Sequence, residues 1–165
     1  MRATFIIPGP PKGKGRPRFA RRGKFVSTYT DDTTARYENL VILEFQRQCP
    51  GVKLEGPLWI RIRSSFPVPA SWSKKRKAET YYHTGKPDAD NILKIVCDSL
   101  NGIAFSDDSI IARAEIIKHY DAEPQVWVCI ETIDHTEQGK RKGINAAGDR
   151  CDLPHISTAE EANHE

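Results

Sequence analysis

The sequence predicts one domain of the α/β class (α+β), and three observations lead to this prediction. The chain has 165 residues, enough for one well-packed core but too few for two. Apolar and polar residues alternate over 58–66 and 125–133, as in strands with one buried face. Apolar residues recur at helical spacing over 33–48 and 91–101. Strands and two main helices should therefore share one core.

The N-terminal part begins with a short predicted strand over residues 3–7. The Pro-Gly-Pro-Pro run at 8–11 ends it, because proline fixes the backbone and lacks the amide hydrogen that a sheet needs. The segment that follows, 12–24, is rich in basic residues and is predicted to be a loop.

The first main helix is predicted over 33–48. Asp31 or Asp32 is suited to cap its start, because a short polar side chain there satisfies a free backbone amide. The Pro-Gly pair at 50–51 ends the helix, since proline cannot continue it.

The predicted strand over 58–66 has two unlike faces. Leucine and isoleucine occupy one side, which should be buried, whereas Trp59, Arg61 and Arg63 share the other, which should be exposed and basic. The polar stretch 67–87 follows and is predicted to be a loop. Loops of this length in small domains are usually functional or disordered.

The second main helix is predicted over 91–101, with an Asn-Gly pair as its stop. Residues 110–120 and 125–133 then predict two strands joined by a short turn. Because they are close in sequence, we expect these two strands to pair as a hairpin.

The folded domain is predicted to cover residues 1–134. The remaining residues, 135–165, lose hydrophobic periodicity and are predicted to form a weakly ordered polar tail. No apolar run approaches the ~20 residues of a membrane span, and the N-terminus lacks the zones of a secretion signal. We therefore expect a cytoplasmic protein, with its four scattered cysteines reduced.

Positive charge is concentrated in two segments, although the net charge is only +3. The first runs from residue 12 to 24 and contains no acid; the second is the block at 74–77. Concentrated basic charge favours a phosphate-rich partner. The alternative is that both runs are merely solvated loops.

Two acids stand where the second main helix begins. Asp88 precedes the regular helix and Asp90 lies near its cap, so both carboxylates can face one point beside the helix start. Helical spacing places Asp90 and Lys94 on the polar side of that helix, together with Asp98. Adjacent carboxylates repel each other unless a cation neutralises them.

This pattern favours a magnesium site. Mg²⁺ prefers carboxylate oxygens and keeps several waters, so it can bridge to a substrate phosphate. Lys94 is suited to hold that phosphate or to stabilise charge in the transition state, and metal-bound water to supply the attacking hydroxide.

Simpler interpretations remain open from the spacing alone. Asp88 and Asp90 could be helix caps, Asp90 and Lys94 an ordinary surface pair, and the later Asp107-Asp108 pair a turn. An EF-hand calcium loop fits poorly, because Ile92 and Leu93 stand where an oxygen ligand and glycine are needed.

The sequence resembles the RusA family of Holliday-junction resolvases, small phage- and prophage-associated endonucleases, over residues 3–134. Four ordered motifs carry the resemblance: Pro-Gly-Pro-Pro-Lys at 8–12 with Arg-Pro-Arg at 16–18, Trp-Ser-Lys-Lys at 72–75, Lys-Pro-Asp-Ala-Asp-Asn-Ile-Leu-Lys at 86–94, and Asp-Ser-Leu-Asn-Gly at 98–102 with Asp-Asp-Ser at 107–109.

The resemblance implies a homodimer with a mixed, mostly antiparallel sheet flanked by the two main helices. It implies paired symmetric nicks in four-way junctions during DNA recombination and repair, with Mg²⁺, or Mn²⁺ in its place, as cofactor. The metal ligands it implies are Asp88, Asp90 and Asp108, and Lys94 matches the family's essential lysine. Asp107 and Asn91 are supporting candidates.

We expect basic side chains to seat the DNA backbone, while the acids cut it. The expected DNA-binding residues are Lys12, Lys14, Arg16, Arg18, Lys74, Lys75 and Arg76, with Arg61 and Arg63. Two other functions fit part of this pattern: a non-catalytic module that binds branched DNA, and a metal-dependent phosphodiesterase for another nucleic-acid structure.

Overall fold

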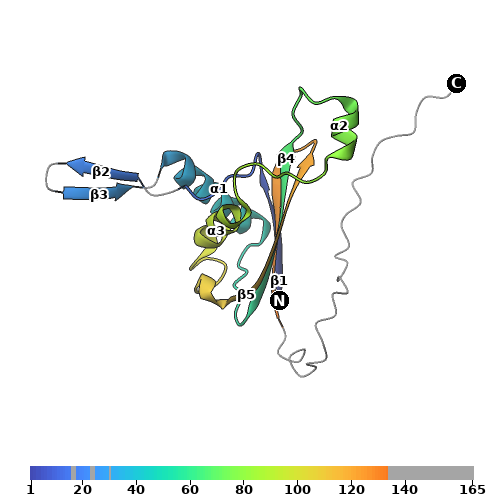
Figure 1. Ribbon diagram of the computed structural model, residues 1–165. Coiled ribbons are helices and arrows are strands. Elements are labelled where there is room, and N and C mark those ends of the chain that lie inside the picture. The colour runs from blue at the N-terminus through green and yellow to red at the C-terminus, as the bar shows by residue number, and fades with distance from the viewer. Residues whose placement is uncertain (16–17, 23–24, 30, 134–165) are drawn as a thin grey trace. The chain divides into compact units, whose positions relative to one another are not determined.

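The frame of the protein is a four-stranded mixed sheet (Figure 1). The computed structural model describes residues 1–133 apart from 16–17, 23–24 and 30. The predictions for Arg16 and for the tail over 135–165 lie outside the described residues.

The strands of this sheet lie in the order β1-β6-β4-β5. Their bounds are β1 Arg2–Pro8, β4 Leu58–Pro67, β5 Ile111–Asp121 and β6 Gln125–Thr132. β6 pairs antiparallel with both β1 and β4, whereas β4 and β5 are parallel. The predicted mixed, mostly antiparallel sheet is therefore confirmed.

The predicted hairpin between the last two strands is wrong. β4 lies between β5 and β6 and pairs with both, for example through Ile62 with Ile116 of β5 and Val128 of β6. β4 buries side chains along most of its length, so it is stabilised by neighbours on both edges. Alternation along a strand indicates which side is buried but does not specify its partner.

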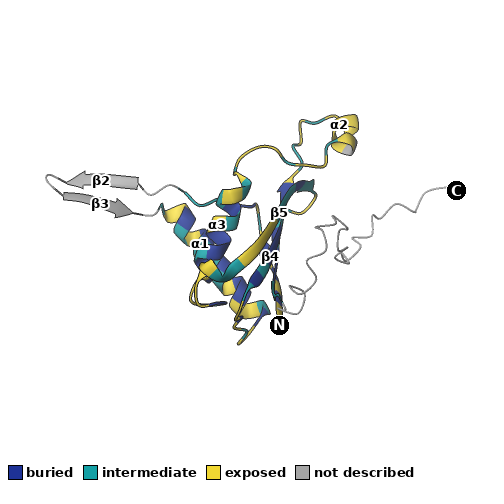
Figure 2. Ribbon diagram, turned by 60° about the horizontal axis from the view of Figure 1, so that its bottom comes forward, coloured by how far each residue is buried: buried dark blue, intermediate teal, exposed yellow. Residues whose placement is uncertain are grey.

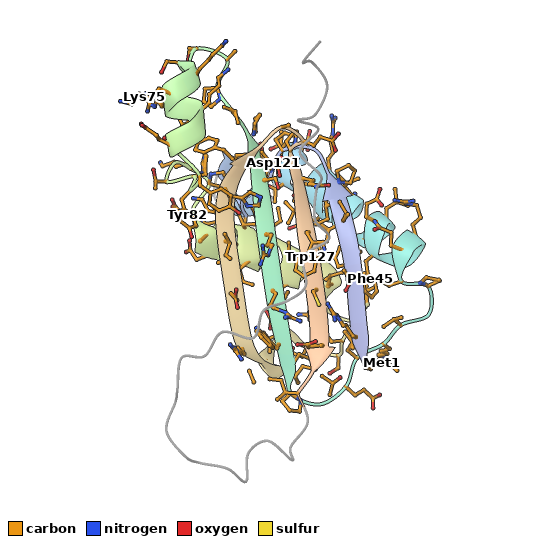
Figure 3. All side chains as sticks on the ribbon, turned by 90° about the vertical axis from the view of Figure 1, so that its right-hand side faces the viewer. Met1, Phe45, Lys75, Tyr82, Asp121 and Trp127 are labelled. Atoms are coloured by element: carbon orange, nitrogen blue, oxygen red, sulfur yellow. The ribbon has the colours of Figure 1, made fainter. Side chains whose placement is uncertain are left out.

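Two helices cover one face of the sheet: α1, Asp32–Gln48, and α3, Ala89–Leu100. Figure 3 shows the four strands in front of both helices, and Figure 2 shows the buried residues gathered between them. Phe5 of β1 and Phe45 of α1 meet edge to face, 5.5 Å between ring centroids. The side chains that fill this layer include Ile7, Val41, Ile60, Ile62, Ile92, Ile95, Leu100, Val128 and Ile130.

Two segments predicted to be loops contain regular structure. The basic segment holds β2, Arg18–Arg22, which pairs antiparallel with β3, Phe25–Tyr29. The stretch 67–87 holds a short helix, α2, Lys74–Glu79, capped by the Ser73 hydroxyl, which accepts a hydrogen bond from the Arg76 amide. Both elements are rich in polar residues, so hydrophobic periodicity does not reveal them.

The prediction that Arg61 belongs to an exposed basic face is wrong. β4 is an interior strand with neighbours on both edges, and one of them supplies a partner for Arg61. It is only 7% exposed, and its guanidinium pairs with Glu131 of β6 at 2.9 Å. The Trp59 ring lies beneath this guanidinium and that of Arg113, at 4.2 and 3.7 Å from the ring centroid. Arg61 is therefore occupied within the sheet.

The thiols of Cys49, Cys97 and Cys129 are free and buried, as expected for reduced cysteines. Among the described residues, no helix has the length and apolar character needed to cross a membrane.

Candidate functional site

The start of α3 carries the two acids of the Asp-x-Asp motif. The helix forms because Ile92, Ile95 and Val96 all turn toward the sheet and are fully buried. That orientation leaves Asp90, in the first turn, and Lys94 exposed to solvent. Asp88 is the N-cap residue, yet its side chain makes no capping hydrogen bond. Its carboxylate is therefore available to a ligand.

The segment before Asp88 is attached to β5. Tyr82 forms an antiparallel bridge with His119, and the His83 amide donates to the Lys118 carbonyl at 3.0 Å. The Lys118 ammonium donates to the carbonyls of Gly85 at 2.6 Å and Pro87 at 2.7 Å. These bonds fix the backbone up to Asp88.

Residues 9–15, which follow β1 and are called the N-terminal arm below, pack on the other side of this segment. The Lys14 amide donates to the Asn91 carbonyl at 2.8 Å. A Cβ atom on Gly13 would lie 2.9 Å from the Pro87 Cβ and 3.0 Å from the Asn91 Cβ, so only glycine allows this approach. Asn91, predicted as a supporting residue, thus contributes through its backbone and its packing.

The arm, the segment and the helix start enclose an open pocket of about 620 Å³. Its lining residues are Gly13, Lys14, Lys86, Pro87, Asp88 and Asn91. The exposed Lys86 and the exposed Asp88, whose carboxylate has no ion-pair partner among the described residues, thus share one surface. This mixture suits a phosphate group that is bound together with a cation.

Lys14 is not free to bind DNA. Its ammonium pairs with Asp98 of α3 at 3.0 Å and also with Glu38 of α1. Burial lowers the pKa of Lys14, but hydrogen bonds from its ammonium to the two carboxylates outweigh this effect and raise the pKa above its usual value. Lys14 therefore links the arm to both helices through ion pairs.

Asp107 and Asp108 follow α3 and begin a 3₁₀ turn, η1, Asp108–Ile110. The Asp107 carboxylate accepts a hydrogen bond from the Ser109 amide at 2.9 Å, and hydrogen bonding to Ser109 lowers the pKa of Asp107. Asp107, predicted as a supporting residue, therefore caps this turn. Asp108 is exposed and has no such hydrogen bond in the described part of the chain.

Asp108 lies close enough to Cys97, in the C-terminal half of α3, for its charge to act on that thiol. Burial raises the pKa of the Cys97 thiol to about 12, and the nearby carboxylates of Asp108 and Asp98 add to this rise. The third predicted acid is therefore near α3, the helix at whose start the other two acids stand.

Asp88 and Asp90 both stand at the start of α3, but the described residues do not form a cluster of three acids around them. Among the described residues, no group of three His, Cys, Asp or Glu side chains lies together so that it could hold a metal ion. A pair of acids is nevertheless sufficient for Mg²⁺, which is commonly bound by one or two carboxylates, waters and a substrate phosphate. The chemistry of Asp88 and Asp90 fits that ion.

The other predicted DNA-binding residues lie on two elements. Lys12 is exposed on the N-terminal arm, and only the backbone of Arg18 is described. Lys74, Lys75 and Arg76 are exposed on α2. Lys75 lies 3.9 Å from Glu79, and the Arg76 guanidinium stacks on Trp72 at 4.3 Å. Figure 3 shows Lys75 on α2 and Tyr82 beside β5.

Sequence reasoning missed Lys118, although a pattern in β5 could have revealed it. Ala114, Ile116, Lys118 and Tyr120 share the side of the strand that faces the helices, as their pairing with Ile60, Ile62, Ser64 and Phe66 shows. A lysine at an inward position among apolar residues needs a specific polar partner. Here the partners are backbone carbonyls beside Asp88.

One set of side chains resembles a hydrolase triad but cannot act as one. Ser65 and Asp121 both lie near the same nitrogen of His119, Nε2, at 3.1 and 3.7 Å. A triad needs the acid and the nucleophile on opposite ring nitrogens. Ser65 is also only 4% exposed, so a substrate cannot reach it.

Comparison with known proteins gives the same family as the sequence motifs. A family model described as Endodeoxyribonuclease RusA matches residues 8–131, which include the arm, both acids of α3 and the 3₁₀ turn. Uncharacterized protein YqaN of Bacillus subtilis (strain 168) is 33% identical over 135 residues, covering 78% of this chain and 95% of that protein. The chain therefore belongs to the RusA family of endodeoxyribonucleases.

Proposed function

We propose that this protein is a metal-dependent endonuclease that resolves Holliday junctions by paired nicks, acting as a homodimer. The observation that carries the proposal is the pair of exposed carboxylates, Asp88 and Asp90, which have no ion-pair partner in the described part of the chain; Asp88 also lines a pocket together with Lys86. In a chain that belongs to the RusA family, this is the arrangement expected at a phosphodiester-cleaving centre.

Asp88 and Asp90 are the proposed ligands of Mg²⁺, with Mn²⁺ as an alternative ion and Asp108 as the proposed third ligand. When bound, such an ion supplies charge neutralisation at the phosphate and lowers the pKa of a coordinated water. Lys94 lies one turn after Asp90 on the exposed side of α3, where its ammonium can stabilise charge on the phosphate oxygens.

Junction DNA is proposed to lie against α2 and the N-terminal arm. The exposed cations Lys74, Lys75 and Arg76 and the exposed Lys12 provide phosphate contacts without a part in the chemistry. Two such subunits would present two active sites, which suits two symmetric cuts.

The test is incubation of purified protein with a labelled four-way junction, with Mg²⁺ or with a chelator. We expect paired nicks with Mg²⁺ only. Asp90→Asn should abolish them and leave junction binding largely intact, whereas Glu55→Gln, an exposed acid outside the pocket, should cut normally. Normal cleavage by the Asp90→Asn variant would contradict the proposal.

Two other functions can be separated by the same assay. Binding of the junction without cleavage, under any divalent ion, would indicate a non-catalytic module. Preferential cleavage of forked or linear competitors would indicate a phosphodiesterase with another substrate. Neither Asp88 nor Asp90 pairs with a base within the ranges that the structure describes, and this favours catalysis, because acids kept for structure normally cap a helix or pair with a base.

A further inference from the structure

We infer that Lys118 is a positioning residue of the active site, which sets the place of the Asp88 carboxylate by holding the backbone directly before it. This inference rests on the proposed role of Asp88 in binding a metal. Lys118 itself lies on β5, 30 residues further along the chain.

The contact is specific. The Lys118 ammonium donates to the Gly85 carbonyl at 2.6 Å and the Pro87 carbonyl at 2.7 Å. Both are charge-assisted hydrogen bonds, which are shorter and stronger than bonds between neutral groups. Pro87 is bonded directly to Asp88, so the second contact fixes the peptide from which the Asp88 side chain projects.

Lys118 has no acidic partner in the part of the chain that the structure describes. Its ammonium is half-buried, and its contacts are the two neutral carbonyls and, at 6.0 Å, the Phe66 ring. A lysine kept only for stability is normally paired with a carboxylate. Here no acid of the described residues neutralises the positive charge, and the Pro87 carbonyl that it binds belongs to a residue lining the proposed phosphate pocket.

The preceding residues are held by contacts that do not involve the Lys118 ammonium. Backbone hydrogen bonds join Tyr81 to Tyr120 at 2.8 Å and His83 to the Lys118 carbonyl at 3.0 Å. The His83 ring stacks on Phe66 with 3.7 Å between centroids. Loss of the Lys118 ammonium should therefore loosen residues 84–88 and leave 81–83 in place.

The experiment compares Lys118→Met, Lys118→Arg and the control Lys53→Met, which changes an exposed lysine outside the pocket. Methionine keeps the length of the side chain and removes its donors. Hydrogen exchange is measured on residues 81–90, and Mn²⁺ binding to the free protein is measured by electron paramagnetic resonance. Cleavage of a four-way junction is measured against Mg²⁺ concentration, and junction binding is measured with chelator present.

We expect Lys118→Met to speed exchange over 84–88 only and to weaken Mn²⁺ binding by roughly 10-fold or more, as for other residues that orient metal ligands. The Mg²⁺ requirement for cleavage should rise similarly, while junction binding stays unchanged. Lys118→Arg, which keeps the donors, should lie closer to the wild-type protein.

Unchanged exchange over 84–88 would overturn the anchoring contact, and unchanged Mn²⁺ binding would overturn its role at the metal site. These two measurements do not require catalysis. If the wild-type protein cut no junction, that result would instead count against the proposed function. The role of Lys118 would still be decided by hydrogen exchange and Mn²⁺ binding.

Discussion

Lys12 and Lys14 are two residues apart on the same arm, yet the structure gives them different roles. Lys12 is exposed, whereas Lys14 is paired with Glu38 and Asp98, each side chain about one quarter exposed. A free cation favours DNA binding, because each phosphate contact releases counterions. A paired cation mainly stabilises the fold.

This difference predicts opposite effects of two matched substitutions. Lys12→Gln should reduce the salt dependence of junction binding by about one unit of the log–log slope and leave stability unchanged. Lys14→Gln should lower the free energy of unfolding by at most about 1 kcal/mol, because solvent screens a partly exposed pair, and should change the slope less. Salt titrations and thermal unfolding measure both, and equal slopes for the two variants would contradict the assignment.

His83 and His119 predict a loss of stability in weak acid. Burial lowers the pKa of His83 below its usual 6.5, and the charge of Lys118 lowers it further. Burial also lowers the pKa of His119, with Arg63 adding to the effect and Asp121 opposing it. The folded state thus binds protons less readily than the unfolded chain, so the stability from these neutral rings is complete above pH 6.5 and falls as the pH decreases below it.

The measurement is the unfolding midpoint in denaturant at pH 7 and at pH 5. His83→Phe keeps a ring against Phe66 but cannot be protonated, so it should lose less stability over this interval than the wild-type protein. An identical loss in both proteins would show that His83 does not contribute to the pH dependence.

The close packing around Gly13 leaves no room for a side chain at this position. A methyl group at this position would press on Pro87 and Asn91, on either side of Asp88. Gly13→Ala should therefore slow cleavage by displacing the segment that carries Asp88, and should lower the unfolding temperature as the arm is pushed away. A variant with normal cleavage and normal unfolding temperature would mean that the arm moves without consequence.

Among the elements, α2 is the one whose proposed role in DNA binding can be tested directly. Replacing Lys74, Lys75 and Arg76 together by glutamine should weaken junction binding and flatten its salt dependence. The cleavage rate at saturating protein should change little, because α2 contributes no residue to the pocket beside Asp88. A lower rate at saturation with unchanged binding would argue against this separation.

The elements with strong periodicity could be predicted from the sequence, but their pairing could not. β1, β4, α1 and α3 were expected within one or two residues of their observed bounds, because each buries one regular stripe of apolar residues. Alternation in β5 and β6 did not reveal that β4 separates them. Pairing depends on contacts between distant segments, and these are not encoded in the pattern of one strand.

The candidate site also could be predicted only where its residues are close in sequence. Asp88 and Asp90 are two residues apart at the start of α3, so their nearness follows from the sequence, although residues at this spacing do not share a helix face. The occupation of Lys14 by Glu38 and Asp98, and the anchoring role of Lys118, depend on tertiary contacts over more than 20 residues. The same holds for Asp108, which follows α3 in the chain and approaches Cys97 of that helix only through the fold.

For the whole molecule, the proposed homodimer predicts that each subunit cuts one strand of the junction. A mixed dimer of one wild-type subunit and one Asp90→Asn subunit should nick one strand of a junction and leave the opposite strand intact. Differently tagged subunits allow its purification, and a cruciform plasmid distinguishes nicked from linear product. Linear product at the wild-type rate would mean that one subunit performs both cuts.

The connection between the parallel strands β4 and β5 contains α2, the acids of α3 and Asp108. A single uninterrupted stretch of the gene, from about codon 68 to codon 110, therefore encodes the proposed metal ligands, Lys94 and the α2 part of the DNA contact. Variation confined to this stretch could retune what is cut without disturbing the pairing of the four sheet strands. The smallest such change would replace α2 alone with the corresponding segment of a relative, which would alter the proposed DNA contact and leave the proposed metal ligands in place.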